Sequence, residues 1–159
     1  MPGLSLPAHQ VLIQGKAERV EVKVGANATA AKMIPGALVI LDTTENEVQE
    51  AGAKAHGILG IIDVDPTHDI GDAYAVGDNI SIIIPQAGCF VALTMLANED
   101  LVQGDRLVSA ANGEVAEQAV GTMGSQGDII GLAWDTVSGA AAVRFIALWC
   151  YTPEVAAAA

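Results

Sequence analysis

Short runs of apolar residues, each bounded by glycine, proline or polar turn residues, recur along the whole chain. Between residues 19 and 24, valines alternate with charged residues, which places the valines on one face of a strand and the charges on the other. Further apolar runs of strand length lie at residues 38–41, 58–64, 80–84, 90–96, 106–109, 129–134 and 142–151. No segment keeps a helical period through three turns, and the nearest, residues 26–33, stops at Pro35-Gly36. The pattern predicts an all-β fold, a small sandwich or barrel of short strands.

The order of turns and apolar runs indicates an internal two-fold repeat. Residues 33–61 and 101–132 each contain a glycine turn, a strand, a hairpin with asparagine at the bend, and an apolar strand with a glycine inside it. A matching final strand follows each copy, at residues 77–84 and 139–146. Asn112-Gly113 is the strongest hairpin signal in the chain. Because the two copies share the apolar runs, we expect one core rather than two domains.

Composition supports a single folded domain flanked by two irregular ends. Of the 159 residues, 52% are hydrophobic and only 16% are charged, which excludes a disordered chain. Residues 1–15 contain two prolines and follow no clean apolar period, so we expect an extended N-terminal arm there. Residues 16–152 are expected to form a single β domain, and the alanine-rich residues 153–159 a C-terminal tail.

Charge is distributed unevenly and argues against two classes of partner. Residues 1–32 hold four bases and two acids, whereas residues 33–159 hold three bases and seventeen acids, for a formal net charge of −12. A body this acidic repels phosphate, so we expect no binding to nucleic acid. The chain has no basic leader before an apolar stretch and no apolar run long enough for a membrane helix, so we expect a soluble protein without membrane contact.

No residue pattern in the chain is typical of a catalytic or metal site. Cys89 and Cys150 form no C-x-x-C pair, the three histidines lack metal-ligand spacing, and no serine lies in a G-x-S-x-G motif. The carboxylates between Asp63 and Asp78 could hold a hard cation, but their spacing fits no calcium loop, and a solvated acidic loop is the favoured interpretation. We therefore expect a protein that is not an enzyme, with no catalytic residue and no cofactor.

The aromatic residues are few, and three of them stand out near the C-terminal end. Trp134, Trp149 and Tyr151 are more typical of core or subunit-interface anchors than of residues that stack on a ligand. We list all three as candidate subunit-interface residues.

The repeated pattern resembles the small head-decoration (capsid cement) proteins of tailed phages. The likeness is carried mainly by V-G-D-N-I at 76–80, P-Q-A-G at 85–88, V-Q-G-D-R-L-V-S at 102–109 and G-E-V at 113–115, and with the first copy it covers about residues 33–148. These are turn and core patterns rather than catalytic signatures. The acidic loop at 63–79 and the alanine tail depart from the shortest members of the family.

This resemblance implies a structural protein of the virion. Such proteins bind the major capsid protein on the outer surface of the shell, stabilise it as homotrimers at three-fold and quasi-three-fold positions, and reside in the host cytoplasm during assembly. Their N-terminal arm docks on the shell, often by adding a strand to it. The residues that would contact the capsid here are Leu4, Leu6, Val11, Leu12, Ile13, Lys16 and Arg19.

Two other functions remain open on the sequence. Gly60-Ile61-Ile62-Asp63 followed by Asp65 resembles a strand motif of trimeric dUTPase-type nucleotide hydrolases, but the phosphate-binding and C-terminal arginine motifs of that family are missing. With seven bases in total, the chain offers little to hold a triphosphate. The third interpretation is another virion β module, from a tail or a baseplate, which would share this composition.

Overall fold

The computed structural model describes residues 4–118 and 127–151, and it is all-β, as the sequence predicts. The C-terminal tail expected at residues 153–159 lies outside the described residues. The strands in these two ranges are β1 (Leu12–Gln14), β2 (Ala17–Val24), β3 (Leu38–Leu41), β4 (Glu47–Glu50), β5 (Ile58–Ile62), β6 (Asn79–Pro85), β7 (Phe90–Met95), β8 (Asp100–Leu101), β9 (Arg106–Ser109), β10 (Val115–Glu117), β11 (Gly131–Ala133), β12 (Val137–Ser138) and β13 (Val143–Trp149). Two single-turn 3₁₀ helices, η1 (Ala30–Lys32) and η2 (Ala111–Gly113), lie between strands. Within the described residues, no helix is long and apolar enough to cross a membrane.

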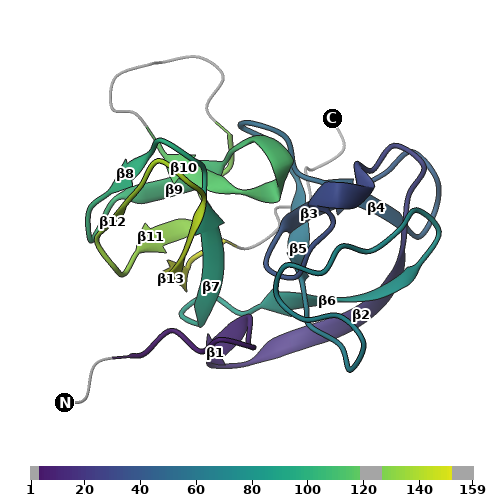
Figure 1. The fold of residues 1–159 in the computed structure, drawn as a ribbon, viewed down its shortest axis with the longest axis horizontal. Helices are drawn as coiled ribbons and strands as arrows, with labels where there is room; N and C mark the ends of the chain where they lie inside the picture. Colours follow the sequence, from purple (N-terminus) through teal and green to yellow (C-terminus); the bar gives the residue numbers. More distant parts are fainter. Residues whose placement is uncertain (1–3, 119–126, 152–159) are drawn as a thin grey trace, which may run out of the picture.

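The first half of the chain forms a closed barrel with strand order β2-β4-β3-β5-β6, which we call the first barrel. All of its pairings are antiparallel except that of β2 with β4. In β2, Val22 and Val24 point inward and are buried, as the alternation predicts, whereas Val20 stays 40% exposed. The barrel occupies the right-hand lobe in Figure 1.

The second half repeats this topology, which confirms the internal repeat. Its sheet has the order β1-β7-β10-β9-β11-β13, and an additional pairing of β7 with β13 closes the last five strands into what we call the second barrel. Strands β7, β9, β10, β11 and β13 take the places of β2, β3, β4, β5 and β6, and again only the pairing of β7 with β10 is parallel. The short strands β8 and β12 form a separate two-stranded sheet beside it.

The asparagines of the repeat lie at matching bends. Asn46 precedes β4 with φ of 62°, and Asn112 precedes β10 with φ of 64°. Asparagine adopts this left-handed conformation more readily than most residues because its short polar side chain can bond locally. The same residue type therefore reverses the chain at the same point of each barrel.

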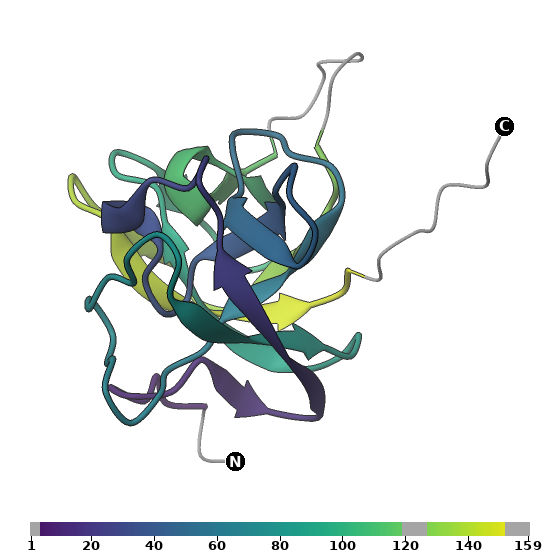
Figure 2. The ribbon, with the colours of Figure 1, turned by 90° about the vertical axis from the view of Figure 1, so that its right-hand side faces the viewer.

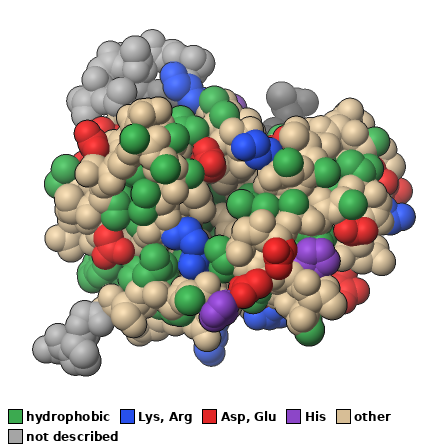
Figure 3. Space-filling model, in the orientation of Figure 1, with side chains coloured by type: hydrophobic (Ala, Val, Ile, Leu, Met, Phe, Trp, Pro, Cys, Tyr) green, Lys and Arg blue, Asp and Glu red, His purple; other side chains and the backbone are tan. Residues whose placement is uncertain are grey.

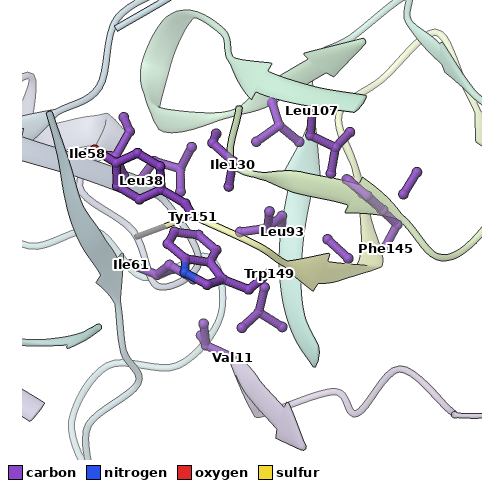
Figure 4. Close-up of a cluster of buried hydrophobic side chains, with 14 of the residues drawn as sticks. Val11, Leu38, Ile58, Ile61, Leu93, Leu107, Ile130, Phe145, Trp149 and Tyr151 are labelled. Atoms are coloured by element: carbon purple, nitrogen blue, oxygen red, sulfur yellow. The ribbon is translucent and has the colours of Figure 1, made fainter. Parts of the chain in front are cut away.

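The larger of the two buried clusters belongs to both barrels at once. Leu38, Ile58 and Ile61 of the first barrel point toward Trp149, at the end of β13 in the second barrel, and toward Tyr151, which follows it (Figure 4). The smaller cluster, around Val39, Val48 and Ile82, lies within the first barrel alone. The larger cluster thus joins the two barrels, and side chains from the first complete the interior of the second.

Residues at the end of the expected arm belong to the folded body. Strand β1 pairs with the start of β7, and Ala92 donates its N–H to the carbonyl oxygen of Val11 at 2.8 Å. The side chain of Val11 is 1% exposed and lies in the larger cluster beneath Trp149 (Figure 4).

Candidate interaction surface

The N-terminal segment is fastened to the second barrel by Arg144 of β13. The guanidinium group donates hydrogen bonds to the carbonyl oxygens of Pro7 at 3.1 Å, Ala8 at 3.4 Å and Gln10 at 2.8 Å. Burial lowers the pKa of Arg144, and the nearby carboxylate of Asp69 opposes that effect. Three backbone oxygens on one cation hold the segment in place before it enters β1.

The acidic loop between β5 and β6 reaches the same segment. His9 Nδ1 lies 2.5 Å from Asp69 Oδ2, and both side chains are exposed. The N–H of Ile70 lowers the pKa of Asp69, burial acts in the opposite direction, and His9 lowers it further. The loop therefore bridges the first barrel to the N-terminal segment.

Most carboxylates at the start of this loop are used internally. Asp63 is 3% exposed and accepts hydrogen bonds from Arg19 and from the N–H of Val64. Asp65 accepts hydrogen bonds from Thr67, from the N–H of His68 and from the hydroxyl of Tyr74. Burial raises the pKa of Asp65, but these hydrogen bonds outweigh it and hold the pKa well below its usual range. In the described residues, no group of three or more His, Cys, Asp or Glu side chains is arranged to hold a metal ion.

The outer face of the second barrel carries a row of apolar side chains. Phe90, Leu148 and Leu132 lie directly opposite one another on β7, β13 and β11, and all three are half-buried. Their neighbours along the strands, such as Val91 and Ala147, are buried because alternate residues point inward. The row thus lies on the outside of the barrel.

Trp134 extends this row, and β1 borders it. The indole is 40% exposed and meets the ring of Phe90 edge to face at 4.8 Å between centroids. Gln14 of β1 pairs with Phe90 on the other side. We call Gln14, Phe90, Leu132, Trp134 and Leu148 the outer apolar face.

Charge is nearly absent from the strands that form this face. Strands β1, β7, β11 and β13 contain one charged residue between them, Arg144, in a chain whose net charge is −12. Figure 3 shows apolar side chains over much of the left-hand lobe, with a few acidic and basic side chains among them. An apolar patch of this kind on an acidic protein is typical of a contact site for another protein.

The structure brings some of the expected contact residues to this face and places others elsewhere. Leu12 and Ile13 are half-buried in β1, at the border of the outer apolar face, and Leu6 is 38% exposed before it. Leu4 is half-buried near the start of the described chain. Lys16 is exposed, and its backbone is bonded to the thiol of Cys89.

Four of the expected contact residues have structural roles inside the chain. Trp149 and Tyr151 are 2% and 8% exposed and lie in the chain's own core, because their positions in and after β13 point into the second barrel. They are thus core residues here rather than exposed interface residues, and Val11 is buried with them. Arg19 binds Asp63 on the first barrel.

Sequence reasoning missed Phe90, Leu132, Leu148 and Arg144. The first three alternate with buried residues in their strands, but both faces of these strands are apolar, so no polar alternation marks the outer one. Arg144 binds backbone oxygens, which every residue has, so its partners leave no signal in the sequence. Only the absence of acids from these strands could have indicated the face.

Comparison with known proteins gives no family. No protein-family model matches the chain, and no curated protein matches it in sequence. Among solved structures, the chain is similar to the head fiber gp8.5 N base of bacteriophage phi29, at 12% identity and a TM-score of 0.49, over 83% of this chain and 94% of that one. At this identity and TM-score, the likeness assigns neither a family nor a function to the chain.

Proposed function

We propose that the chain is a structural protein of a phage virion that binds the outside of the capsid and cements the shell, as trimers at three-fold and quasi-three-fold positions. The observation that carries the proposal is the outer apolar face, a sheet surface whose strands contain no carboxylate, bordered by a fastened N-terminal segment on an otherwise acidic molecule. It supports the function implied by the sequence resemblance. Under this proposal the protein performs no catalysis.

Physical considerations favour contact through this face. An acidic protein meets the least electrostatic repulsion from other carboxylates where it carries none itself, and the strands of the face contain none. Cementing then needs only apolar area buried at joints of the shell, which raises the free energy required to open it. Trp134 and Leu6 are exposed apolar side chains of the kind that anchor such contacts.

The dUTPase-like interpretation gains no support from the geometry of its motif. Asp63 is buried against Arg19, and Gly60 lies against the backbone of β6, where an added Cβ would meet the oxygen of Ile83 at 2.4 Å. These residues hold the first barrel together. The interpretation as a tail or baseplate module is separated from cementing by the experiment that follows.

The test is co-sedimentation of the purified protein with expanded capsids of the virus that encodes it. We expect saturation near about one copy per major capsid protein, since a closed set of three-fold contacts gives each capsid subunit an equivalent site. Trp134→Asp should weaken pelleting at least about tenfold, because a carboxylate in an apolar contact is left unpaired. Leu41→Asp, at an apolar residue 61% exposed on the first barrel, is the matched control and should pellet like the wild type.

Each outcome bears on a separate part of the proposal. Absence of pelleting at every concentration would remove the cementing function, and hydrolysis of dUTP with magnesium would then be tested. Pelleting that Trp134→Asp leaves unchanged would show that the outer apolar face is not the docking site. Chemical cross-linking of the bound protein that gives dimers but no trimers would reject the trimeric arrangement.

A further inference from the structure

One edge of β2 carries backbone groups that no strand pairs with. Strand β6 runs beside β2 from Ala17 to Lys23, whereas β4 meets β2 only at Lys23 and Val24. On the β6 side, Val24 donates its N–H to Asp78, and the carbonyl of Lys16 accepts a hydrogen bond from Gln86. On the opposite side, Lys23 donates its N–H to Asn46. Because these directions alternate along a strand, the N–H and C=O groups of Arg19 and Glu21 point away from β6. In the described residues no other strand lies along that edge.

The repeat shows that a strand fits at this position of the fold. Strand β7 takes the place of β2 in the second barrel, and it also meets its parallel neighbour only at its end, where Met95 pairs with Val115. The remaining edge of β7 is covered by β1, which adds to it in antiparallel direction. Each barrel therefore leaves one edge open beside its first strand, and β1 covers only one of the two.

The open edge of β2 has neither a bulge nor a proline, two features that block strand addition. Pairing with β6 continues through seven successive residues without a bulge, and β2 contains no proline. Val20, at the middle of the edge, is 40% exposed although it is apolar. In Figure 2, β2 lies at the front of the molecule.

The sequence of β2 is complementary to itself in one antiparallel register. Hydrogen-bonded pairing across the edge must match odd-numbered residues with odd-numbered ones, because only these turn their backbone groups outward. Placing Val20 opposite Val20 puts Arg19 opposite Glu21 twice, once on each side of the two-fold axis. The two neighbouring registers that keep odd residues opposite odd ones are centred on residue 19 or on residue 21. The first places Arg19 opposite Arg19, the second places Glu21 opposite Glu21, and both pairs repel.

We propose that the free edge of β2 binds β2 of a second copy of this chain, antiparallel and about a two-fold axis at Val20. Four backbone hydrogen bonds join Arg19 and Glu21 of one copy to Glu21 and Arg19 of the other. The two valines bury each other's exposed surface at the axis. Arg19 can reach Glu21 of the second copy because its side chain is 62% exposed despite its bond to Asp63.

This two-fold contact goes beyond the proposed capsid function and does not depend on it. It uses the first barrel, whereas the outer apolar face belongs to the second. The two contacts therefore respond to different substitutions. A failure of capsid binding says nothing about the β2 edge, and the reverse also holds.

The test is sedimentation equilibrium of the purified chain over a wide range of concentration. We expect the average mass of the wild type to rise toward twice that of its smallest species. Glu21→Arg places arginines opposite each other, and Val20→Lys places two lysines at the axis, so each should raise the dissociation constant about tenfold or more. Glu117→Arg, the same change at an exposed strand residue of the second barrel, is the control and should associate like the wild type.

A mixing experiment tests the register itself. Arg19→Glu and Glu21→Arg should each fail to associate alone, but an equal mixture restores two opposite-charge pairs, so mixed dimers should form. Amide hydrogen exchange of the wild type should show protection of Arg19 and Glu21 that increases with concentration. A thermal melt shows whether the Arg19→Glu variant remains folded without its bond to Asp63. If it unfolds, the proposal is tested by the association of Glu21→Arg and Val20→Lys instead. Wild-type mass that stays constant with concentration, or association that neither of these two variants weakens, would overturn the proposal.

Discussion

At the residue scale, two glycines fix how closely neighbouring strands approach in each barrel. A Cβ added to Gly131 of β11 would lie 2.0 Å from the carbonyl oxygen of Leu148, and one added to Gly60 of β5 would lie 2.4 Å from that of Ile83. Gly131 and Gly60 hold the same place in the repeat, each facing the last strand of its barrel. The atom that each side chain would meet belongs to the backbone, which cannot move aside without disturbing the ladder.

We expect Gly131→Ala to lower the free energy of unfolding by about 1–3 kcal/mol, the usual cost of forcing extra volume into packed structure. Gly52→Ala is the matched control, because nothing lies within 4 Å of its added Cβ. Urea unfolding of both variants gives the comparison. Equal stability of the two would show that the close approach at Gly131 is not a constraint.

Asp128 joins three parts of the chain through its carboxylate. It receives hydrogen bonds from the N–H of Gly57 at 2.8 Å and the hydroxyl of Tyr151 at 3.0 Å, and its other oxygen lies 2.8 Å from His56 Nδ1. Burial raises the pKa of Asp128, but the bonds from His56, Gly57 and Tyr151 outweigh it and lower the pKa overall. The carboxylate form is therefore favoured in the folded chain.

This lowered pKa gives a defined dependence of stability on pH. The stabilisation is fully present above the pKa of the unfolded chain, about 3.9, and is lost as the pH falls through the lower folded value. Asp128→Asn should be less stable than the wild type near neutral pH, and the difference should shrink below about pH 4. Urea unfolding across this range measures it. Asp100→Asn is the control, because Asp100 is an exposed carboxylate with no side-chain hydrogen bond in the described ranges. If the difference in stability between the wild type and Asp128→Asn stays constant with pH, Asp128 is not the source of the pH dependence.

At the scale of elements, the N-terminal segment has an exposed part before its contacts with Arg144 and a structural part that these contacts and β1 hold in place. Leu6 precedes the contacts with Arg144 and is exposed, whereas Val11 is buried and β1 pairs with β7. We expect removal of residues 1–6 to change the free energy of unfolding by less than about 0.5 kcal/mol, as for surface changes. Removal of residues 1–14 should cost at least about 2 kcal/mol, because it takes a buried valine out of the core. Thermal or urea unfolding of the two truncations measures this, and equal stability would show that β1 contributes nothing to the fold.

The elements also show what sequence patterns can and cannot predict. The repeat was predictable because turns depend on local chemistry, as in the asparagines before β4 and β10 and the glycines inside β5 and β11. The parallel pairing of β2 with β4 was not predictable from the sequence. It joins segments about 24 residues apart, and only the closed barrel fixes their register. Similarly, the depth of Trp149 depends on the first barrel covering the second, and nothing near Trp149 in the sequence indicates that.

At the scale of the whole molecule, the two barrels differ in how they fill their interiors. The first encloses its own cluster, with Val39, Val48 and Ile82 buried inside it. The second shares its core with Leu38 and Ile61 of the first, which are fully buried against it. Two copies of one topology thus form one cooperative unit, because only one of them has a complete core of its own.

We therefore expect residues 86–151 to be unfolded when expressed alone. Without the first barrel, Trp149 and the residues around it would face water, and the apolar area they bury is the main source of stability for so small a unit. Mixing this fragment with residues 1–85 should restore dispersed NMR signals and the fluorescence of a buried tryptophan. Ile61→Ala in the first fragment should weaken this reassembly, by about 2–5 kcal/mol if the cavity persists, whereas Leu41→Ala, at an exposed residue, should not. A cooperative melt from residues 86–151 alone would show that the second barrel completes its own core.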